Sequence, residues 1–284
     1  MDLIHTPLGA TIYRKSNANE SGVNIHTYVE PTLGNATHVI EGPKSLILVD
    51  SQYFVSAARD FRQYVNMIDK PIALMIISHD HPDHYFGLSA EFDDVKAAAL
   101  PDVAKSIKEE GPETLVQSKM TYGDQDLPNS VTYPKYFLQP GRQTYEGIEF
   151  DLKKVMNAED EEQLVIDLPG LNTIIIQDLS YNGYHAHLFG YNEKNPKAWN
   201  PASWLNAIRS LTETPRGYVL VGHGAPTNMD VFRINIIYLT SVNSLLNYAK
   251  SPEEFAELLF YMFPDLKGRK IVDMYRPYLE QRMA

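Results

Sequence analysis

The hexapeptide His79–His84, with the sequence HDHPDH, holds the densest group of metal-binding side chains in the chain. Three of only nine histidines in 284 residues fall within these six positions. His79 and His81 follow an apolar run, and alternate side chains of an extended backbone point the same way, so both imidazoles can reach one ion. Asp83 and His84 come where a helix can begin, with Asp83 as its N-cap, and would address a neighbouring position. One short segment can therefore supply ligands to two adjacent metal ions.

The composition restricts both the ligands and the partners of such a site. The chain has no cysteine, so metal ligands must be His, Asp, Glu or main-chain oxygen, a set that suits zinc, iron or manganese. The net charge of -11 and the lack of a dense basic tract argue against nucleic acid. The N-terminus does not resemble a secretion signal, and the apolar runs are too short to span a bilayer. We expect a cytoplasmic protein that acts on a small molecule, away from membranes.

Four short apolar runs each lead to a residue that can do chemistry. They are residues 45–49 before Asp50, 72–77 before His79, 173–176 before Asp178, and 218–221 before His223. Continuous apolar runs of this length are typical of strands buried on both faces between helical layers. Layered α/β proteins place their sites at the ends of such strands.

The segments between and after these runs have helical or irregular patterns. Helices are predicted at residues 55–68, 101–119, 201–211, 230–248, 252–263 and 271–282, and loops with edge strands at 120–147. We expect one catalytic domain over residues 1–228 and a helical extension over 229–284. The extension could be a lid, a homodimer surface or plain packing against the domain.

The order of these features resembles the metallo-β-lactamase superfamily over approximately residues 20–228. The HxHxDH run matches the family motif, Asp178 falls at the metal-bridging carboxylate, and His223 in Gly-His-Gly matches the last histidine ligand. Asp50 closes an early strand behind the site, as an aspartate commonly does there. The resemblance implies an α/β fold of the four-layer αββα sandwich type, with two divalent metal ions at one edge. Zinc is the first expectation, and manganese or iron are the alternatives.

One ligand position departs from the family pattern. The family usually has a further histidine where this chain reads Asn157-Ala158-Glu159, and Glu159 falls at the missing position. The alkylsulfatase branch is similar here, since it carries a glutamate where others carry histidine. Glu159 is therefore a candidate ligand beside His79 and His81. Alternatively, residues 159–162 form a solvated acidic turn and the first metal site is incomplete, with Asn157 as a weaker substitute.

The resemblance also implies a mechanism, in which a metal-bound hydroxide hydrolyses a small ester-like bond. Asp83 and Asp178 would be the catalytic carboxylates, and the bond could be a carboxylic ester, a lactone or a thioester. The alkylsulfatase-like glutamate keeps sulfate esters as an alternative. An iron-dependent redox or oxygen-using member of the superfamily, or a non-catalytic binding relative, are further alternatives.

Two residues near the bridging aspartate are candidates for the substrate pocket. His185 follows Asp178 at a position where similar proteins have a pocket histidine, and the Tyr181 hydroxyl could donate a hydrogen bond to a developing oxyanion. We interpret His187 as a surface or structural histidine, and Trp199 and Trp204 as packing residues.

Overall fold

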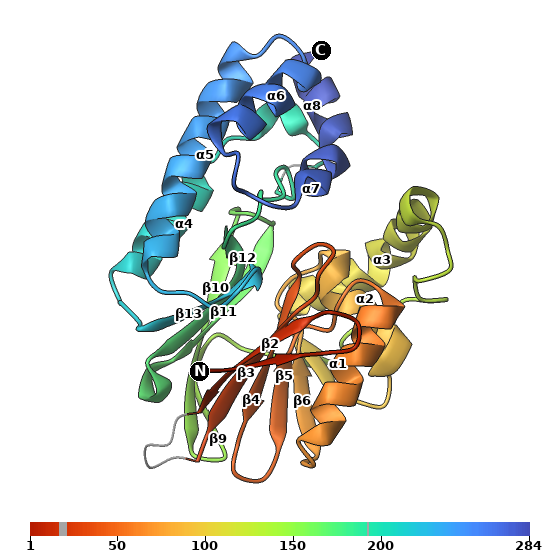
Figure 1. The fold of residues 1–284 in the computed structure, drawn as a ribbon, viewed down its shortest axis with the longest axis vertical. Coiled ribbons are helices and arrows are strands. Elements are labelled where there is room, and N and C mark those ends of the chain that lie inside the picture. Colours follow the sequence, from red (N-terminus) through yellow and green to blue (C-terminus); the bar gives the residue numbers. More distant parts are fainter. Residues whose placement is uncertain (17–21, 192) are drawn as a thin grey trace.

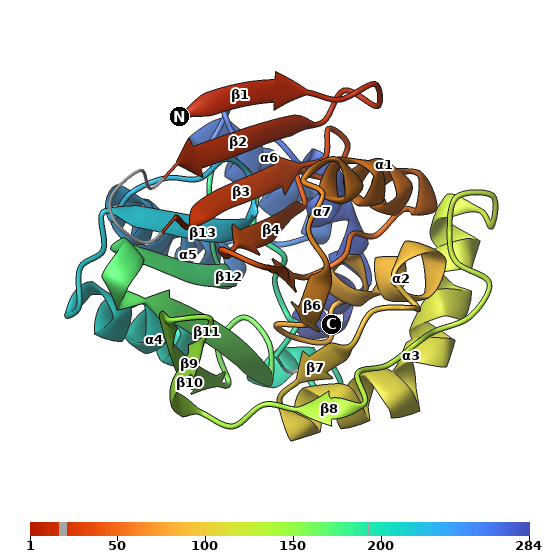
Figure 2. The ribbon, with the colours of Figure 1, turned by 90° about the horizontal axis from the view of Figure 1, so that it is seen from below.

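Two β-sheets face each other in the structure, and helices cover the outer face of each (Figures 1 and 2). The computed structural model describes residues 1–16, 22–191 and 193–284. The predicted αββα sandwich is therefore confirmed, with further helices at the C-terminal end. None of the helices in these described ranges is long and apolar enough to cross a membrane.

The first sheet has eight strands in chain order. Neighbouring strands are antiparallel from β1 to β5 and parallel from β5 to β8. The strands are β1 (Asp2–His5), β2 (Thr11–Ser16), β3 (Asn24–Val29), β4 (Ala36–Glu41), β5 (Leu46–Val49), β6 (Ile72–Ile76), β7 (Ala97–Ala99) and β8 (Tyr136–Phe137).

The second sheet has five strands in the order β13-β12-β11-β10-β9. Only its β12–β13 pair is parallel. The strands are β9 (Gly141–Tyr145), β10 (Ile148–Met156), β11 (Glu162–Leu168), β12 (Thr173–Tyr181) and β13 (Tyr218–His223).

Helices α1 to α3 lie on the side of the first sheet, and α4 and α5 on the side of the second (Figure 2). The C-terminal helices α6 to α8 gather at one end of the sandwich (Figure 1). The helices are α1 (Val55–Met67), α2 (Pro82–Glu91), α3 (Pro101–Tyr122), α4 (Ala202–Thr212), α5 (Asp230–Tyr248), α6 (Pro252–Met262), α7 (Arg269–Met274) and α8 (Arg276–Met283), with short 3-10 turns at Pro169–Leu171 and Pro196–Ala198.

Alternate residues of the second sheet pack into two different cores, which explains the continuous apolar runs in its sequence. Leu164 and Ile166 of β11 and Ile175 of β12 belong to the core that contains the first sheet. Val165 and Ile174, one position away from these, pack with the residues of α4 and α5. Side chains of a strand alternate between its faces, so a strand between two cores is apolar at every position.

The predicted helix at residues 271–282 is two helices rather than one. The first, α7, ends at Met274, and α8 begins at Arg276 with Pro277 in its first turn. Proline favours the start of a helix and interrupts the hydrogen bonds of a helix interior, so the chain turns at Tyr275. This break gives the end of the chain two short helices that can wrap over the top of the sandwich.

The opposite end of the first sheet holds a buried charged group, Glu41 at the end of β4. Its carboxylate accepts hydrogen bonds from Lys70 (2.7 Å), Asn24 (2.7 Å) and His26 (2.9 Å). Burial would raise the pKa of Glu41, but the hydrogen bonds from these partners hold it at about 2. His26 therefore has a structural role in this network.

Candidate metal centre

The hexapeptide His79–His84 links β6 to α2 at the edge where the two sheets meet. His79 follows the strand, and His81 stands at the N-cap position of α2 without a side-chain cap. Asp83 therefore lies in the first helical turn instead of at the predicted N-cap. The reason is Pro82, whose fixed φ angle favours the first helical position.

The first group of potential ligands consists of His79, His81, Glu159 and Asp178. One ligand atom from each lies within 4.8 Å of all the others. The Glu159 carboxylate is 3.5 Å from His81 Nδ1 and 3.9 Å from His79 Nε2, and Asp178 Oδ2 is 4.0 Å from His79 Nε2. Glu159 is fully buried, so it is not part of a solvated acidic turn. It lies beside His79 and His81, as its match to the missing histidine position of the family led us to expect.

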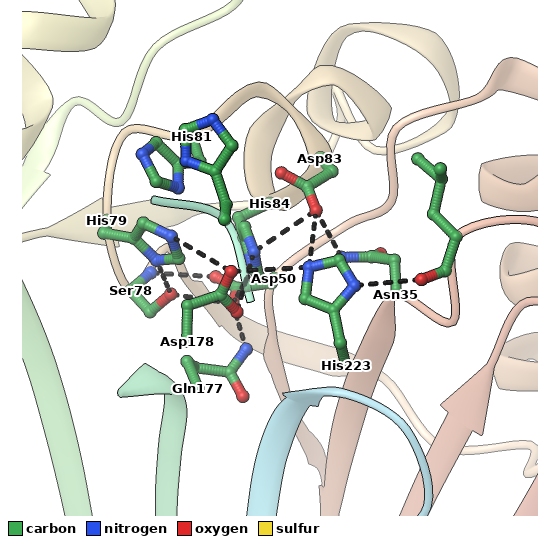
Figure 3. A network of polar contacts seen from close by, with 12 residues as sticks. Asn35, Asp50, Ser78, His79, His81, Asp83, His84, Gln177, Asp178 and His223 are labelled. Carbon is green, nitrogen blue, oxygen red and sulfur yellow. Dashed lines mark hydrogen bonds and ion pairs between the residues drawn. The ribbon is translucent and has the colours of Figure 1, made fainter. Parts of the chain in front are cut away.

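The second group consists of Asp83, His84 and His223, again within 4.8 Å of one another. Asp83 Oδ2 lies 3.5 Å from His84 Nε2 and 3.1 Å from His223 Nε2. Asp178 faces this group as well, at 3.3 Å from the Nε2 atom of each histidine. Asp178 therefore lies between the two groups, which Figure 3 shows directly.

The side-chain chemistry of both groups fits divalent cations. His79 Nε2, His84 Nε2, Glu159 Oε1 and Asp178 Oδ1 are buried and form no hydrogen bond with the described part of the chain. Leaving such polar atoms unpaired in the interior costs about 1–3 kcal/mol each. Metal ions would supply the missing partners, because imidazole nitrogen and carboxylate oxygen are their common ligands.

The three buried histidines are held so that their Nε2 atoms face the two groups (Figure 3). Each Nδ1 atom has another partner: Ser78 Oγ at 2.9 Å from His79, Asp50 Oδ2 at 2.8 Å from His84, and the Leu33 carbonyl at 3.1 Å from His223. Such outer contacts fix the ring orientation and the tautomer of a histidine ligand.

Asp50 organises the layer behind the ligands. Its carboxylate accepts hydrogen bonds from the Ser78 amide and hydroxyl, both at 2.8 Å, from His84 and from Gln177. Asp50 and Gln177 both have positive φ angles, 63° and 44°, which non-glycine residues rarely adopt. Uncommon backbone angles concentrate at functional sites, where the surrounding structure maintains them.

Local backbone features bring Asp178 and His223 together. The pairing of β12 with β13 shifts register on both sides of Gln177, and such irregularities redirect the side chains of a strand. Gly222 lets β13 approach closely, because a Cβ atom there would lie 1.7 Å from Asp178 Oδ1. This contact explains the glycine before His223 in the Gly-His-Gly segment.

The two central carboxylates differ in their electrostatic surroundings. Burial raises the pKa of Glu159 well above its usual value, and the neighbouring Asp178 adds to the effect. Burial also opposes the charge of Asp178, but His223 and His84 hold its pKa well below the usual value. Without a bound cation, burial therefore favours the neutral form of Glu159, and the two histidines favour the charged form of Asp178.

A cavity of about 340 Å³ opens above both ligand groups. Tyr181 lines it, but its hydroxyl donates a 2.6 Å hydrogen bond to Asp178 Oδ2 and its ring stacks on His223. His187 also lines the cavity: its ring centre is 5.1 Å from that of His81, and its Nδ1 atom is 3.8 Å from Glu159. Burial and the nearby His81 lower the pKa of His187 to about 3, so it is neutral at pH 7.

The structure places the two histidines after Asp178 the other way round from our expectation. His185 is fully buried, contacts the hydroxyl of Tyr238 at 3.2 Å and packs against Phe260, and it does not line the cavity. His187, and not His185, therefore lines the cavity, and a role of His185 in substrate binding stays a prediction. The segment is not a strand, so positions two apart need not share a side.

Two ligand groups at the edge of an αββα sandwich define a class of metal-binding α/β proteins. The family model of the Metallo-beta-lactamase superfamily matches residues 31–223, and the chain belongs to that superfamily. No curated protein matches the chain by sequence.

Solved structures support the fold at low sequence identity. A metallo-beta-lactamase from Pontibacter korlensis matches with a TM-score of 0.60 and 15% identity, over 81% of this chain and 99% of that one. A metallo beta lactamase from Erythrobacter litoralis matches with a TM-score of 0.58 and 16% identity, over 84% of this chain and 99% of that one. TMB-1 matches with a TM-score of 0.57 and 12% identity, over 86% of this chain and 98% of that one.

Proposed function

We propose that the protein is a metal-dependent hydrolase that cleaves a small ester-like bond: a carboxylic ester, a lactone or a thioester. The observation that carries the proposal is the pair of ligand groups that share Asp178 beneath an open cavity. When bound, divalent ions acidify water and polarise the oxygen of the scissile group.

The residues of the chain would divide this work between them. His79, His81 and Glu159 would hold one ion and Asp83, His84 and His223 the other, with Asp178 facing both. Tyr181 fixes the Asp178 carboxylate through its hydrogen bond, so we assign it a positioning role instead of oxyanion binding. His187, as a neutral imidazole in the cavity wall, can offer an N–H to the leaving group or to the substrate.

The test is a substrate panel with defined metal loading. Protein stripped by chelator and reloaded with zinc, manganese or iron should hydrolyse activated carboxylic esters, lactones or thioesters. Asp83→Ala and Asp178→Ala should abolish that turnover while the circular dichroism spectrum stays that of the folded protein. Full activity in both variants would show that the site is assigned wrongly. Redox-active iron with no hydrolysis in any loading would favour the redox alternative.

A further inference from the structure

Apart from the metal-binding residues and two acidic residues at the mouth, the walls of the cavity are apolar or uncharged. Gln117, Thr121 and Tyr122 of α3 form one side, and Ile271 and Met274 of α7 form another. These walls suit the carbon skeleton of a small substrate, since pockets for small molecules are mostly apolar with few polar groups.

Apart from the metal-binding residues, the charged side chains of the described ranges that line the cavity are acidic. They are Glu193 and Asp273, which are both exposed and therefore lie at the mouth. Among the described residues no lysine or arginine lines the cavity. Partial burial of its carboxylate raises the pKa of Glu193 to about 7, so at pH 8 a substrate that enters meets negative charge at both residues first.

Four basic residues of the neighbouring segments have other partners. Lys194 pairs with Glu110 at 2.7 Å, and Arg276 pairs with Glu253. Lys267 and Arg269 lie over aromatic rings, at 5.9 Å from the ring centre of Tyr184 and 4.7 Å from that of Phe260. None of these cations lines the cavity to receive a sulfate, phosphate or carboxylate group.

The ligand set itself also reduces attraction for anions. Asp83, Asp178 and Glu159 together carry three negative charges when ions are bound, against four positive charges on two divalent ions. With a histidine in place of Glu159, the same ions would leave one more positive charge to attract an anionic substrate.

Taken together, these observations lead us to infer that the cavity selects esters that are uncharged or positively charged, with an apolar body, and discriminates against anionic ones. The inference rests on the proposed function and names its substrate class. A cationic group, such as a primary or quaternary ammonium, would lie at the mouth near Glu193 and Asp273, while the scissile bond lies over the metal ligands. Sulfate esters, which the glutamate ligand suggests by resemblance, are disfavoured by the same charges.

The test compares esters that differ only in one end group. Zinc-loaded protein is assayed with nitrophenyl esters of one acyl length, ending in trimethylammonium, methyl or sulfonate. At pH 8, above the pKa of Glu193, and at low ionic strength we expect kcat/KM for the trimethylammonium ester to exceed that for the sulfonate ester at least tenfold. Added salt should reduce this ratio. Equal values, or a preference for the sulfonate ester or for nitrophenyl sulfate, would overturn the inference.

Variants locate the source of the preference. The double variant Glu193→Gln/Asp273→Asn should reduce the ratio of the two kcat/KM values at least threefold. The matched control is Glu257→Gln/Asp265→Asn, which removes two exposed charges outside the cavity and should leave the ratio unchanged. A ratio that falls equally in the control would mean that overall charge, and not the cavity mouth, is responsible.

A binding measurement separates failure of the inference from failure of the proposed function. Unreactive amide analogues with the same three end groups are titrated calorimetrically into zinc-loaded protein. If no ester is hydrolysed, the proposed function fails, and tighter binding of the trimethylammonium amide still supports the charge selection. If the methyl ester is hydrolysed but neither assay shows a charge preference, the inference fails and the proposed function stands.

Discussion

Replacing Glu159 by glutamine tests the feature that distinguishes this site from the family pattern. In the metal-free protein burial favours the neutral form of Glu159, because it raises the pKa well above the usual value. Glutamine is nearly isosteric with the neutral acid and can still accept the 2.7 Å hydrogen bond from Gln163. We therefore expect the metal-free variant to differ from the wild type by less than about 1 kcal/mol in unfolding free energy.

With metal present the two proteins should differ clearly. Loss of an outer contact to a metal ligand costs 10–100-fold in affinity, so loss of a charged ligand should cost at least about 100-fold. An ion that binds 100-fold more weakly contributes about 2.7 kcal/mol less to the unfolding free energy. For a chain of this size, the metal-induced rise of Tm should be roughly 5–10 °C smaller.

The assay is differential scanning fluorimetry with and without zinc, together with the metal content after dialysis against a chelator. Glu161→Gln is the matched control, because Glu161 is an exposed glutamate two positions away. The Glu159 variant should retain fewer ions than this control and show the smaller rise in Tm. Wild-type metal content and an unchanged rise in Tm would refute the assignment of Glu159 as a ligand.

Four further substitutions test the surroundings of the site and the far end of the first sheet. Asp50→Asn should lower metal affinity 10–100-fold in a chelator competition, since it loses the charged partner of His84. His187→Gln should lower kcat for esters at least tenfold with metal content unchanged, whereas His185→Gln should chiefly lower Tm. The opposite result would support the prediction from the sequence that His185 is the pocket residue. Glu41, with a pKa of about 2 against 4.5 unfolded, stabilises the fold above pH 4.5 and loses this effect as the pH falls towards 2. Glu41→Gln should therefore cost about 2 kcal/mol at pH 7, after solvent screening, and flatten urea-measured stability between pH 5 and 2.

The sequence was sufficient for the fold and for the position of the ligand candidates because both depend on local patterns. Apolar runs that end at Asp50, His79 and His223 mark strands between two cores, and side-chain alternation between those cores requires this composition. The spacing within the hexapeptide similarly fixes which way its side chains can point. These features need no knowledge of distant contacts.

The sequence was insufficient where the outcome depends on tertiary contacts. Irregular backbone after β12 decides that His187 lines the cavity while His185 is buried against Tyr238. The break at Tyr275 arises from Pro277, a local signal that the helical pattern of residues 271–282 concealed. The charge of the cavity mouth depends on Asp273 of α7 and on Glu193, which are eighty residues apart in sequence.

The glutamate ligand and the acidic cavity mouth act in the same direction, although they lie on separate parts of the chain. A third carboxylate beside Asp83 and Asp178 strengthens the hold on hard divalent ions and leaves less positive charge for a substrate. An acidic mouth without a lining cation adds a barrier to anions before they reach the ligands. If Glu159 alone set the charge preference, Glu159→His would make sulfonate and trimethylammonium esters equal substrates. Because Glu193 and Asp273 remain in that variant, we expect the preference to be reduced but not removed. The ratio of the two kcat/KM values in Glu159→His and in Glu193→Gln/Asp273→Asn separates the contribution of the ligand from that of the cavity mouth.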